Sequence, residues 1–156
     1  MNASEVMDPD PSTLKPEDKI GYAAQFIMNK RYRSLPVIDD NGCYVGMFGV
    51  NCLLKQVIPK AVFLQRGLEN VSFIHESLDD LYDRFATSMD QPISECMSKD
   101  VKSVYPDTPL TEILLQLFDT RVSIPVVEEG SCKLLGMISY WDIGEKILKA
   151  GEMRNA

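Results

Sequence analysis

The sequence has very little histidine and no clustered cysteine. Its one histidine is His75, and its four cysteines, Cys43, Cys52, Cys96 and Cys132, lie far apart along the chain. A structural zinc site needs several such ligands at close spacing, and a Ser-His-acid catalytic set needs a well-placed histidine. The sequence therefore predicts no metal site, no catalytic residues and no required cofactor, so we do not expect an enzyme.

Positive charge and long apolar runs are also scarce. Lysine and arginine number 16 against 23 acidic residues, which leaves a net charge of −7. An acidic chain repels phosphate backbones and anionic lipids, so we expect no nucleic-acid partner and no membrane contact, although one local basic pocket stays compatible with this charge. Residues 1–10 have three acids and no apolar run, unlike a signal peptide. These features predict a cytoplasmic protein with reduced thiols.

What the chain does contain is an internal repeat. Its 156 residues, 45% of them hydrophobic, are enough to form a buried core without disulfides or metal. Landmarks of the first half recur 89 or 90 residues later, namely Met7 at Met97, Pro16 at Pro106, residues 34–38 at 123–127, and Gly46-Met47 at Gly136-Met137. Such parallel landmarks indicate two copies of one unit that bury their faces together.

Each copy predicts the same order of elements, β-α-β-β-α. The first helix of each copy has apolar residues at helical spacing, and Asn-Gly at positions 41–42 marks a tight hairpin turn. We predict an α+β protein made of two such units. The expected boundaries are residues 1–58 for unit 1, 59–92 for a connector, 93–150 for unit 2 and 151–156 for a C-terminal tail.

The connector and the last helices carry further predictions. The last helices are expected at residues 51–58 and 140–149, and an amphipathic helix is expected at residues 76–86 of the connector. The run Ala61-Val62-Phe63-Leu64 is unusually apolar for a connector. We predict that this run packs back on the core, and the alternative is a dimer contact or a surface for a partner.

One motif shows which family the repeat resembles. The second unit carries Gly136-Met137-Ile138-Ser139-Tyr140-Trp141-Asp142-Ile143, a strand that ends in Gly-x-h-[Ser/Thr]-x-x-Asp-h, where h is apolar. With the repeated element order, this pattern resembles tandem CBS domains, named for cystathionine beta-synthase and also known as a Bateman module, over residues 1–58 and 93–150. The resemblance implies that two units related by a pseudo-twofold axis pack through their sheets and leave two clefts, and that two modules pair as a homodimer.

The same resemblance implies a ligand and a site. Clefts of this family commonly hold AMP, ADP, ATP, S-adenosylmethionine or NAD. By analogy, Asp142 accepts hydrogen bonds from the ribose hydroxyls, Ser139 contacts a phosphate or ribose oxygen, and the adenine lies between residues 102–104 and 123–125. From their place near the cleft, Tyr140 and Trp141 could stack on the base, although packing at an interface is an equal alternative for Trp141, and Arg33 could contact phosphate. The expected ligand-binding residues are therefore Asp142, Ser139, Lys102, Ser103, Val104, Ser123, Ile124, Pro125, Tyr140 and Arg33.

An alternative without ligand applies to the same motif. Ser139 and Asp142 have the spacing of a capping box, in which the serine bonds a helix N–H and the acid reaches back to the N-cap. On spacing alone the cap is the better interpretation. The duplicated context favours a ligand role for Asp142.

The first unit departs from the motif. Gly49 and Cys52 stand where the second unit has Ser139 and Asp142. Because a thiol is a poor hydrogen-bond acceptor, we predict a single nucleoside site, in the cleft of unit 2.

The phosphate contacts are less well defined by the sequence. Nucleotide-binding relatives often place a basic residue where this chain has Ser34 and Ser123. Arg33 and Arg121 stand nearby and could replace it, although a solvated charge at a helix end is the commoner fate of an arginine. The number of phosphates stays open, and so does a sulfonium ligand.

Two cysteines and the function complete the predictions. Cys43 and Cys132 occupy nearly matching hairpin positions and could form a redox pair, but we expect both to be reduced.

The sequence predicts a regulatory module that senses an adenosine-containing ligand and acts on a partner protein that the sequence does not name. The alternative is a constitutive dimerising or scaffold protein with vestigial clefts.

Overall fold

The computed structural model describes residues 1–59, 62 and 75–156. Within them the elements are α1 (Ala3–Val6), α2 (Ile20–Lys30), β1 (Ser34–Ile38), β2 (Tyr44–Gly49), α3 (Val50–Val57), α5 (Leu78–Ala86), the 3-10 helix η2 (Ile93–Glu95), α6 (Leu110–Thr120), β3 (Ile124–Val127), β4 (Leu134–Ile138) and α7 (Tyr140–Asn155). Short hairpins flanked by helices confirm the predicted α+β class.

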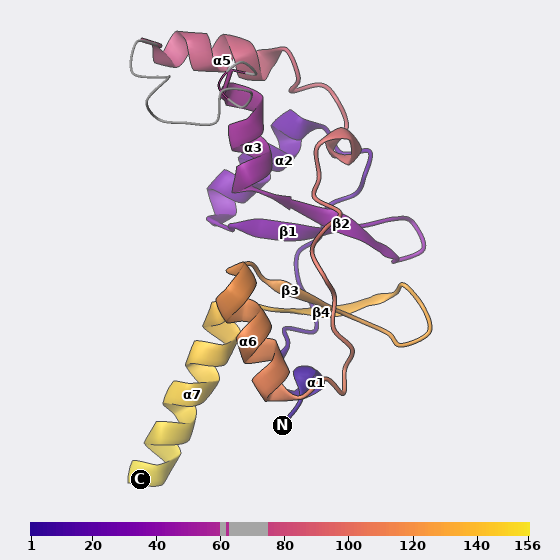
Figure 1. Cartoon of the computed structure of the whole chain (residues 1–156), viewed down its shortest axis with the longest axis vertical. Coiled ribbons are helices and arrows are strands. Elements are labelled where there is room, and N and C mark those ends of the chain that lie inside the picture. Colours follow the sequence, from indigo (N-terminus) through magenta and orange to yellow (C-terminus); the bar gives the residue numbers. More distant parts are fainter. Residues whose placement is uncertain (60–61, 63–74) are drawn as a thin grey trace.

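Two hairpins occupy the centre of the molecule. β1 pairs with β2 and β3 pairs with β4, both antiparallel. The hairpins lie one above the other, with α2 and α3 on the outer side of the first and α6 and α7 on the outer side of the second (Figure 1). The extended pieces predicted before the helices are reduced to single parallel bridges, from Leu14 to Val37 and from Val104 to Val126. The repeat read from the sequence is thus a repeat of structure.

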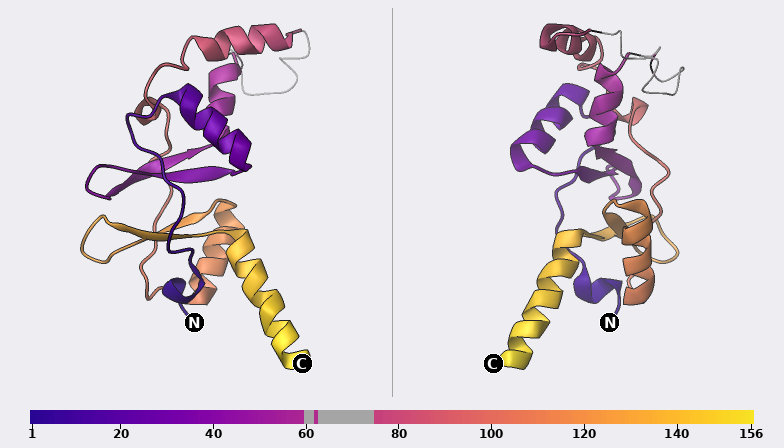
Figure 2. Two further views of the ribbon diagram at one scale, coloured as in Figure 1. Left: turned by 180° about the vertical axis from the view of Figure 1, so that it is seen from behind. Right: turned by 60° about the vertical axis from the view of Figure 1, so that its left-hand side comes forward.

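Residues 3–8, the leading segment of unit 1, stand at the start of that unit in the sequence but pack on unit 2 in the structure. Ala3 and Val6 of α1 belong to the same buried cluster as Ile113. Asp8 and Met137 exchange two backbone hydrogen bonds, of 2.8 and 3.0 Å. Figure 2 shows α1 beside the helices of unit 2 in both views.

Residues 93–98, the leading segment of unit 2, pack on unit 1 in the same way. Ile93 of η2 is fully buried in the cluster that contains Ile20 and Phe48. Met47 and Ser98 exchange two backbone hydrogen bonds of 2.8 Å each. The two units therefore exchange their leading segments, and neither core is complete without residues from the other end of the repeat.

Two equivalent glycines let these segments approach the strands. A Cβ at Gly46 would lie 2.8 Å from the carbonyl oxygen of Ser98, and a Cβ at Gly136 would lie 2.5 Å from that of Asp8. Real Cβ atoms do not approach backbone this closely, so a side chain at either position would push the leading segment away. The glycine in the Gly-x-h motif is required by this close backbone approach.

Two of the predicted helices differ from the structure by more than one residue at an end. The connector helix α5 begins at Leu78 because Ser77 accepts from the Asp80 N–H and Asp80 bonds back to the Ser77 N–H. The last helix α7 continues to Asn155, beyond the predicted end at 149, since only Gly151 among the final residues is a poor helix former. Within the described ranges, no helix is both long enough and apolar enough to cross a lipid bilayer. The apolar run 61–64 lies outside the described residues, except for Val62.

The prediction that Cys43 and Cys132 are reduced is wrong. Their sulfurs form a disulfide, with the two Cα atoms 4.8 Å apart and 89 residues between them in the sequence. Backbone hydrogen bonds between the two hairpin tips bring the cysteines together, a contact between units that composition does not reveal. Cys52 and Cys96 are free thiols.

Candidate functional site

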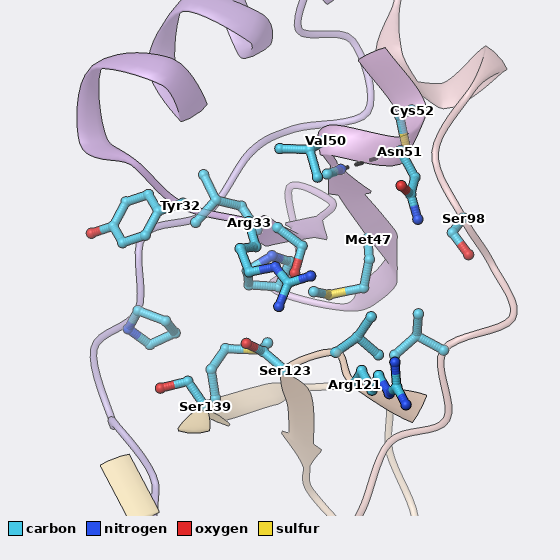
Figure 3. Close-up of a pocket in the computed structure, with 18 of the residues that line it drawn as sticks. Tyr32, Arg33, Met47, Val50, Asn51, Cys52, Ser98, Arg121, Ser123 and Ser139 are labelled. Atoms are coloured by element: carbon cyan, nitrogen blue, oxygen red, sulfur yellow. Dashed lines mark hydrogen bonds between the residues drawn. The ribbon is translucent and has the colours of Figure 1, made fainter. Parts of the chain in front are cut away.

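A cavity of about 570 Å³ lies between the two units. It is bounded by the beginning of β1, the end of β2 and the end of β4, together with the first turns of α3 and α7. Side chains of both units point into it (Figure 3). Its volume is within the range of small-molecule sites, and the N-termini of two helices, whose dipoles favour anions, lie in its wall.

The wall contributed by unit 2 contains the motif residues Ser139 and Asp142. One oxygen of Asp142, Oδ2, accepts from both the N–H and the hydroxyl of Ser139 at 2.7 Å, and the Asp142 N–H donates to the Ser139 hydroxyl at 3.3 Å. The capping box is therefore formed. It uses one carboxylate oxygen, and Asp142 remains part of the cavity lining. The cap fixes the orientation of the carboxylate at the edge of the cavity.

The wall contributed by unit 1 has the same geometry with different chemistry. The Gly49 N–H donates to the Cys52 sulfur at 3.5 Å, in the place of the Ser139 bond to Asp142. A Cβ at Gly49 would lie 2.7 Å from the carbonyl oxygen of Arg33, so a serine does not fit here without a backbone shift. Tight packing on Arg33 explains why this unit lacks the hydroxyl residue of the motif.

Four cationic side chains line the cavity, although the chain as a whole is acidic. They are Arg31, Arg33, Lys55 and Arg121, against the two acids Asp8 and Asp142. In the described part of the chain, none of these four takes part in an ion pair. The cavity is thus a local region of positive charge, which attracts anions.

The backbone of two of these arginines is unusual. Arg31 and Arg121 end α2 and α6 with φ of 56° and 58°, and within the described residues they are the non-glycine residues with positive φ. Glycine occupies this position most easily, since a side chain there costs about 1–2 kcal/mol. They stand 90 residues apart, at equivalent places in the two units, and both line the cavity.

The sequence-predicted site residues divide into two groups. Asp142, Ser139, Ser123, Tyr140 and Arg33 line the cavity. Tyr140 directs its hydroxyl to the carbonyl oxygen of Leu117, at 2.7 Å. In Figure 3, Arg33 enters from the strand side of unit 1, and Ser123 and Ser139 lie across from it on unit 2.

The other group lies outside this cavity and consists of Lys102, Ser103, Val104, Ile124 and Pro125. The Val104 N–H donates to Pro125, and its carbonyl accepts from Val127, so the Val104 N–H is already used within the sheet. The Lys102 carbonyl accepts from Gln116 at 2.9 Å, and the Ile124 side chain is fully buried. Of the residues expected around the adenine, Ser123 therefore belongs to the lining of the cavity that contains Asp142, and residues 102–104, 124 and 125 do not.

Several lining residues were missed by the sequence reasoning, chiefly Arg31, Tyr32, Asn51, Lys55 and Ser98. Most come from unit 1, which the departure at Cys52 had marked as degenerate. The sequence did contain a signal for two of the cationic residues. Arg31 and Arg121 stand 90 residues apart, like the other landmarks of the repeat, and each ends the first helix of its unit. The walls of this cavity come from both units.

The groups with shifted pKa values lie elsewhere. Burial raises the pKa of Tyr44 to about 12 and, with the charges of Cys52 and Glu95 adding to it, raises that of Cys96 to about 11. Hydrogen bonds from Ser77 lower the pKa of Asp80. None of Tyr44, Cys96 and Asp80 lines the cavity. The residues that line the cavity can offer a ligand charged groups, hydrogen-bonding groups and apolar side chains.

Comparison with known proteins gives one family for both halves. The family model described as CBS domain matches residues 3–58 and 93–149. A homoserine O-acetyltransferase of Methanococcoides burtonii is 26% identical over 148 residues, which are 94% of this chain but 24% of that protein. This chain thus spans about a quarter of the length of that curated relative.

Solved structures show the same fold. An acetoin utilization protein, AcuB, from Vibrio cholerae aligns with a TM-score of 0.72 and 20% identity, over 99% of this chain and 96% of that one. The CBS-pair protein CBSX2 from Arabidopsis thaliana aligns with a TM-score of 0.74 and 19% identity, over 97% and 96%. CBSX2 has also been solved in complex with AMP; that structure aligns with a TM-score of 0.71 and 20% identity, over 96% of this chain and 98% of that one.

Proposed function

The chain belongs to the CBS domain family, and from this we propose that it is a regulatory module that binds an adenosine nucleotide in the cavity between its two units. The observation that carries the proposal is a cationic cavity in an acidic protein. The relative CBSX2, which binds AMP, supports the same class of ligand. Binding would favour one arrangement of the two units, and a partner protein would read that arrangement.

The charge of the cavity selects among the candidate ligands. Arg31, Arg33 and Arg121 can pair with phosphate oxygens through two N–H groups each, which is the strongest form of such contacts. A positive sulfonium would meet the same arginines as like charges. We therefore favour AMP, ADP or ATP over S-adenosylmethionine.

The strained arginines support this assignment further. At the ends of α2 and α6, glycine would relieve the backbone, yet both positions hold an arginine that faces the cavity. The cost of the left-handed backbone is offset if the two guanidinium groups hold a ligand. We assign Arg31 and Arg121 to phosphate and Asp142, through its oxygen Oδ1, to a ribose hydroxyl.

We also propose that two copies pair as a homodimer. Large apolar side chains are exposed on the outer helices α6 and α7, with 76% of Phe118, 81% of Trp141 and 71% of Leu148 accessible. Several such side chains on adjoining helices are typical of a surface that is covered in an assembly. This pairing would give the nucleotide a second interface to act on.

The alternative function is a constitutive dimerising or scaffold protein with vestigial clefts. It is favoured by one observation, the capping box, because Asp142 has a purely structural use at the start of α7. In this alternative the dimer forms as proposed, but no adenosine compound changes the stability or the assembly of the protein.

Calorimetric titration tests the proposal. AMP, ADP, ATP, NAD and S-adenosylmethionine are titrated into the full chain, and we expect a phosphate-bearing compound to bind best. Arg121→Gly should weaken its binding by about tenfold or more, since a hydrogen bond to a charged group is worth about 1.5–3 kcal/mol. The same change relieves the positive φ, so it should leave the melting temperature unchanged or higher.

Arg154→Ala is the matched control, since it removes one charge from the exposed end of α7, outside the cavity lining. Its affinity should equal that of the wild type. No binding of any compound supports the scaffold alternative. Tightest binding of S-adenosylmethionine, or full affinity in Arg121→Gly, contradicts the phosphate assignment.

A further inference from the structure

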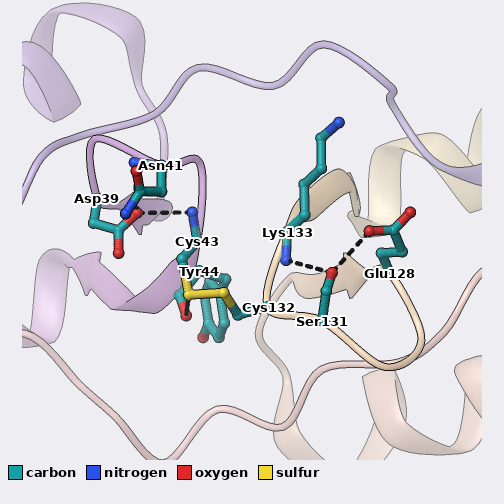
Figure 4. The surroundings of a disulfide bond; sticks show 8 residues. All are labelled: Asp39, Asn41, Cys43, Tyr44, Glu128, Ser131, Cys132 and Lys133. Atoms are coloured by element: carbon teal, nitrogen blue, oxygen red, sulfur yellow. Dashed lines mark hydrogen bonds between the residues drawn. A yellow bond between two sulfur atoms is a disulfide. The ribbon is translucent and has the colours of Figure 1, made fainter.

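One covalent bond joins the two units at the hairpin tips. Cys43 lies in the turn between β1 and β2, and Cys132 lies in the turn between β3 and β4 (Figure 4). β2 begins beside Cys43 and ends at Gly49 in the cavity wall, and β4 likewise leads from near Cys132 to Ser139. The disulfide and the cavity therefore lie at opposite ends of the same two strands.

The hairpin tips are also held together without the sulfurs. The Tyr44 N–H donates to the Cys132 carbonyl at 2.8 Å, and the Leu134 N–H donates to the Gly42 carbonyl at 3.1 Å. These bonds flank the disulfide and keep the two cysteines close when it opens. Closing it again then needs no search by the long intervening chain, whose closure entropy is otherwise large.

The bond is open to attack from solvent on one side. Cys132 is exposed, whereas Cys43 is partly buried beside Asp39, whose carboxylate accepts from the Cys43 N–H at 2.9 Å. Thiol–disulfide exchange requires an approach to one sulfur with the other as leaving group. The greater exposure of the Cys132 residue favours attack on its sulfur, with the Cys43 sulfur as the leaving group.

We propose that the Cys43–Cys132 bond is a reversible exchange site for a dithiol reductant, and that its state sets the affinity of the cavity between the units. A thiolate of the reductant attacks the Cys132 sulfur, and the electron pair of the broken bond goes to the Cys43 sulfur, which takes up a proton. The second thiolate of the reductant then attacks the mixed disulfide and releases Cys132, which is protonated in turn. Two electrons and two protons pass to the protein, and the reductant leaves as a disulfide.

The effect on affinity follows from where the bond lies. With the bond closed, the two hairpins are tied at one end, and the walls of the cavity at the other end vary less in separation. With the bond open, only the hydrogen bonds between the tips tie the hairpins at that end. A ligand that contacts both walls must then restrict a wider set of arrangements and binds more weakly. This second part rests on the proposed nucleotide function, whereas the exchange itself does not.

Thiol counting tests the exchange. The full chain is equilibrated with oxidised or reduced dithiothreitol and then alkylated in denaturant. We expect two reactive thiols, Cys52 and Cys96, in the oxidised protein and four in the reduced one, with the same far-UV circular dichroism in both and full recovery on reoxidation. Four reactive thiols under oxidising conditions, or loss of the fold on reduction, would overturn the proposal.

Titration with ADP of both redox forms tests the coupling. Reduction should weaken the affinity by about fivefold or more, the usual lower range of coupling between sites. Cys132→Ser is the matched control, and its affinity should equal that of the reduced wild type with or without dithiothreitol. Equal affinity in the two forms of the wild type overturns the coupling. Absence of binding in both forms refutes the nucleotide function and the coupling with it, while the thiol count still decides the exchange.

Discussion

A methyl group at Gly136 should detach the leading segment of the chain from unit 2. In Gly136→Ala the new Cβ would lie 2.5 Å from the Asp8 carbonyl oxygen and 2.7 Å from the Met7 sulfur. The Met7 side chain can rotate away, but the carbonyl belongs to the backbone. Asp8 must therefore move out of register with β4.

The size of the effect follows from the bonds that this movement breaks. Asp8 and Met137 exchange two backbone hydrogen bonds, of 2.8 and 3.0 Å. At about 1 kcal/mol for each bond, and with some residual overpacking, the free energy of unfolding should fall by about 2–3 kcal/mol. Since Ala3 and Val6 are anchored by the same segment, their burial in the core of unit 2 should loosen as well.

Urea unfolding followed by circular dichroism measures the loss, and amide hydrogen exchange of residues 3–8 shows where it arises. Gly144→Ala is the matched control, because a Cβ there meets no atom within 4 Å and lies inside α7. That variant should gain about 0.5–1 kcal/mol from helix propensity. Wild-type stability in Gly136→Ala, or a loss without faster exchange at residues 3–8, would refute the exchange of leading segments.

Two further predictions concern alkaline stability and assembly. Burial raises the pKa of Cys96 to about 11 and that of Tyr44 to about 12, so the folded state favours both neutral forms; the resulting stability is present below about pH 9 and is lost as the pH rises from 9 to 12. Unfolding free energies measured across this range should decline more gently in Tyr44→Phe, and an equal slope would argue against the burial effect. Leu148→Glu should shift the molar mass measured by light scattering from dimer to monomer, whereas Asn155→Glu on the same helix should not; a monomeric wild type would remove the proposed interface.

Much of the fold could be predicted from the sequence because it depends on local rules. The 89- and 90-residue landmarks revealed the repeat, and the Asn-Gly turn and the apolar spacing of the first helices indicated the first hairpin and the helices α2 and α6. The capping box of Ser139 and Asp142 was recognised for the same reason, since caps are made within four neighbouring residues. The overlooked end of α7 shows the limit of this approach where no strong stop signal exists.

The candidate site was predicted only in part, since it depends on which surfaces meet. Residues 102–104 were expected beside the base, but in the fold Val104 pairs with β3 through both its N–H and its carbonyl and lies outside the cavity lining. A solvated charge at a helix end was one interpretation of Arg121, but the contact between units makes it part of the cavity wall.

The sequence by itself determined the duplicated unit, its α+β composition and the family to which it belongs, because periodicity, turns and caps are properties of neighbouring residues. Only the tertiary structure decided that the leading segments cross between units, that Cys43 meets Cys132, and that four cationic side chains of an acidic chain face one cavity. Each of these features brings together residues that are distant in the chain. Hydrogen bonding and close packing between the two units specify them, and local conformational preference does not.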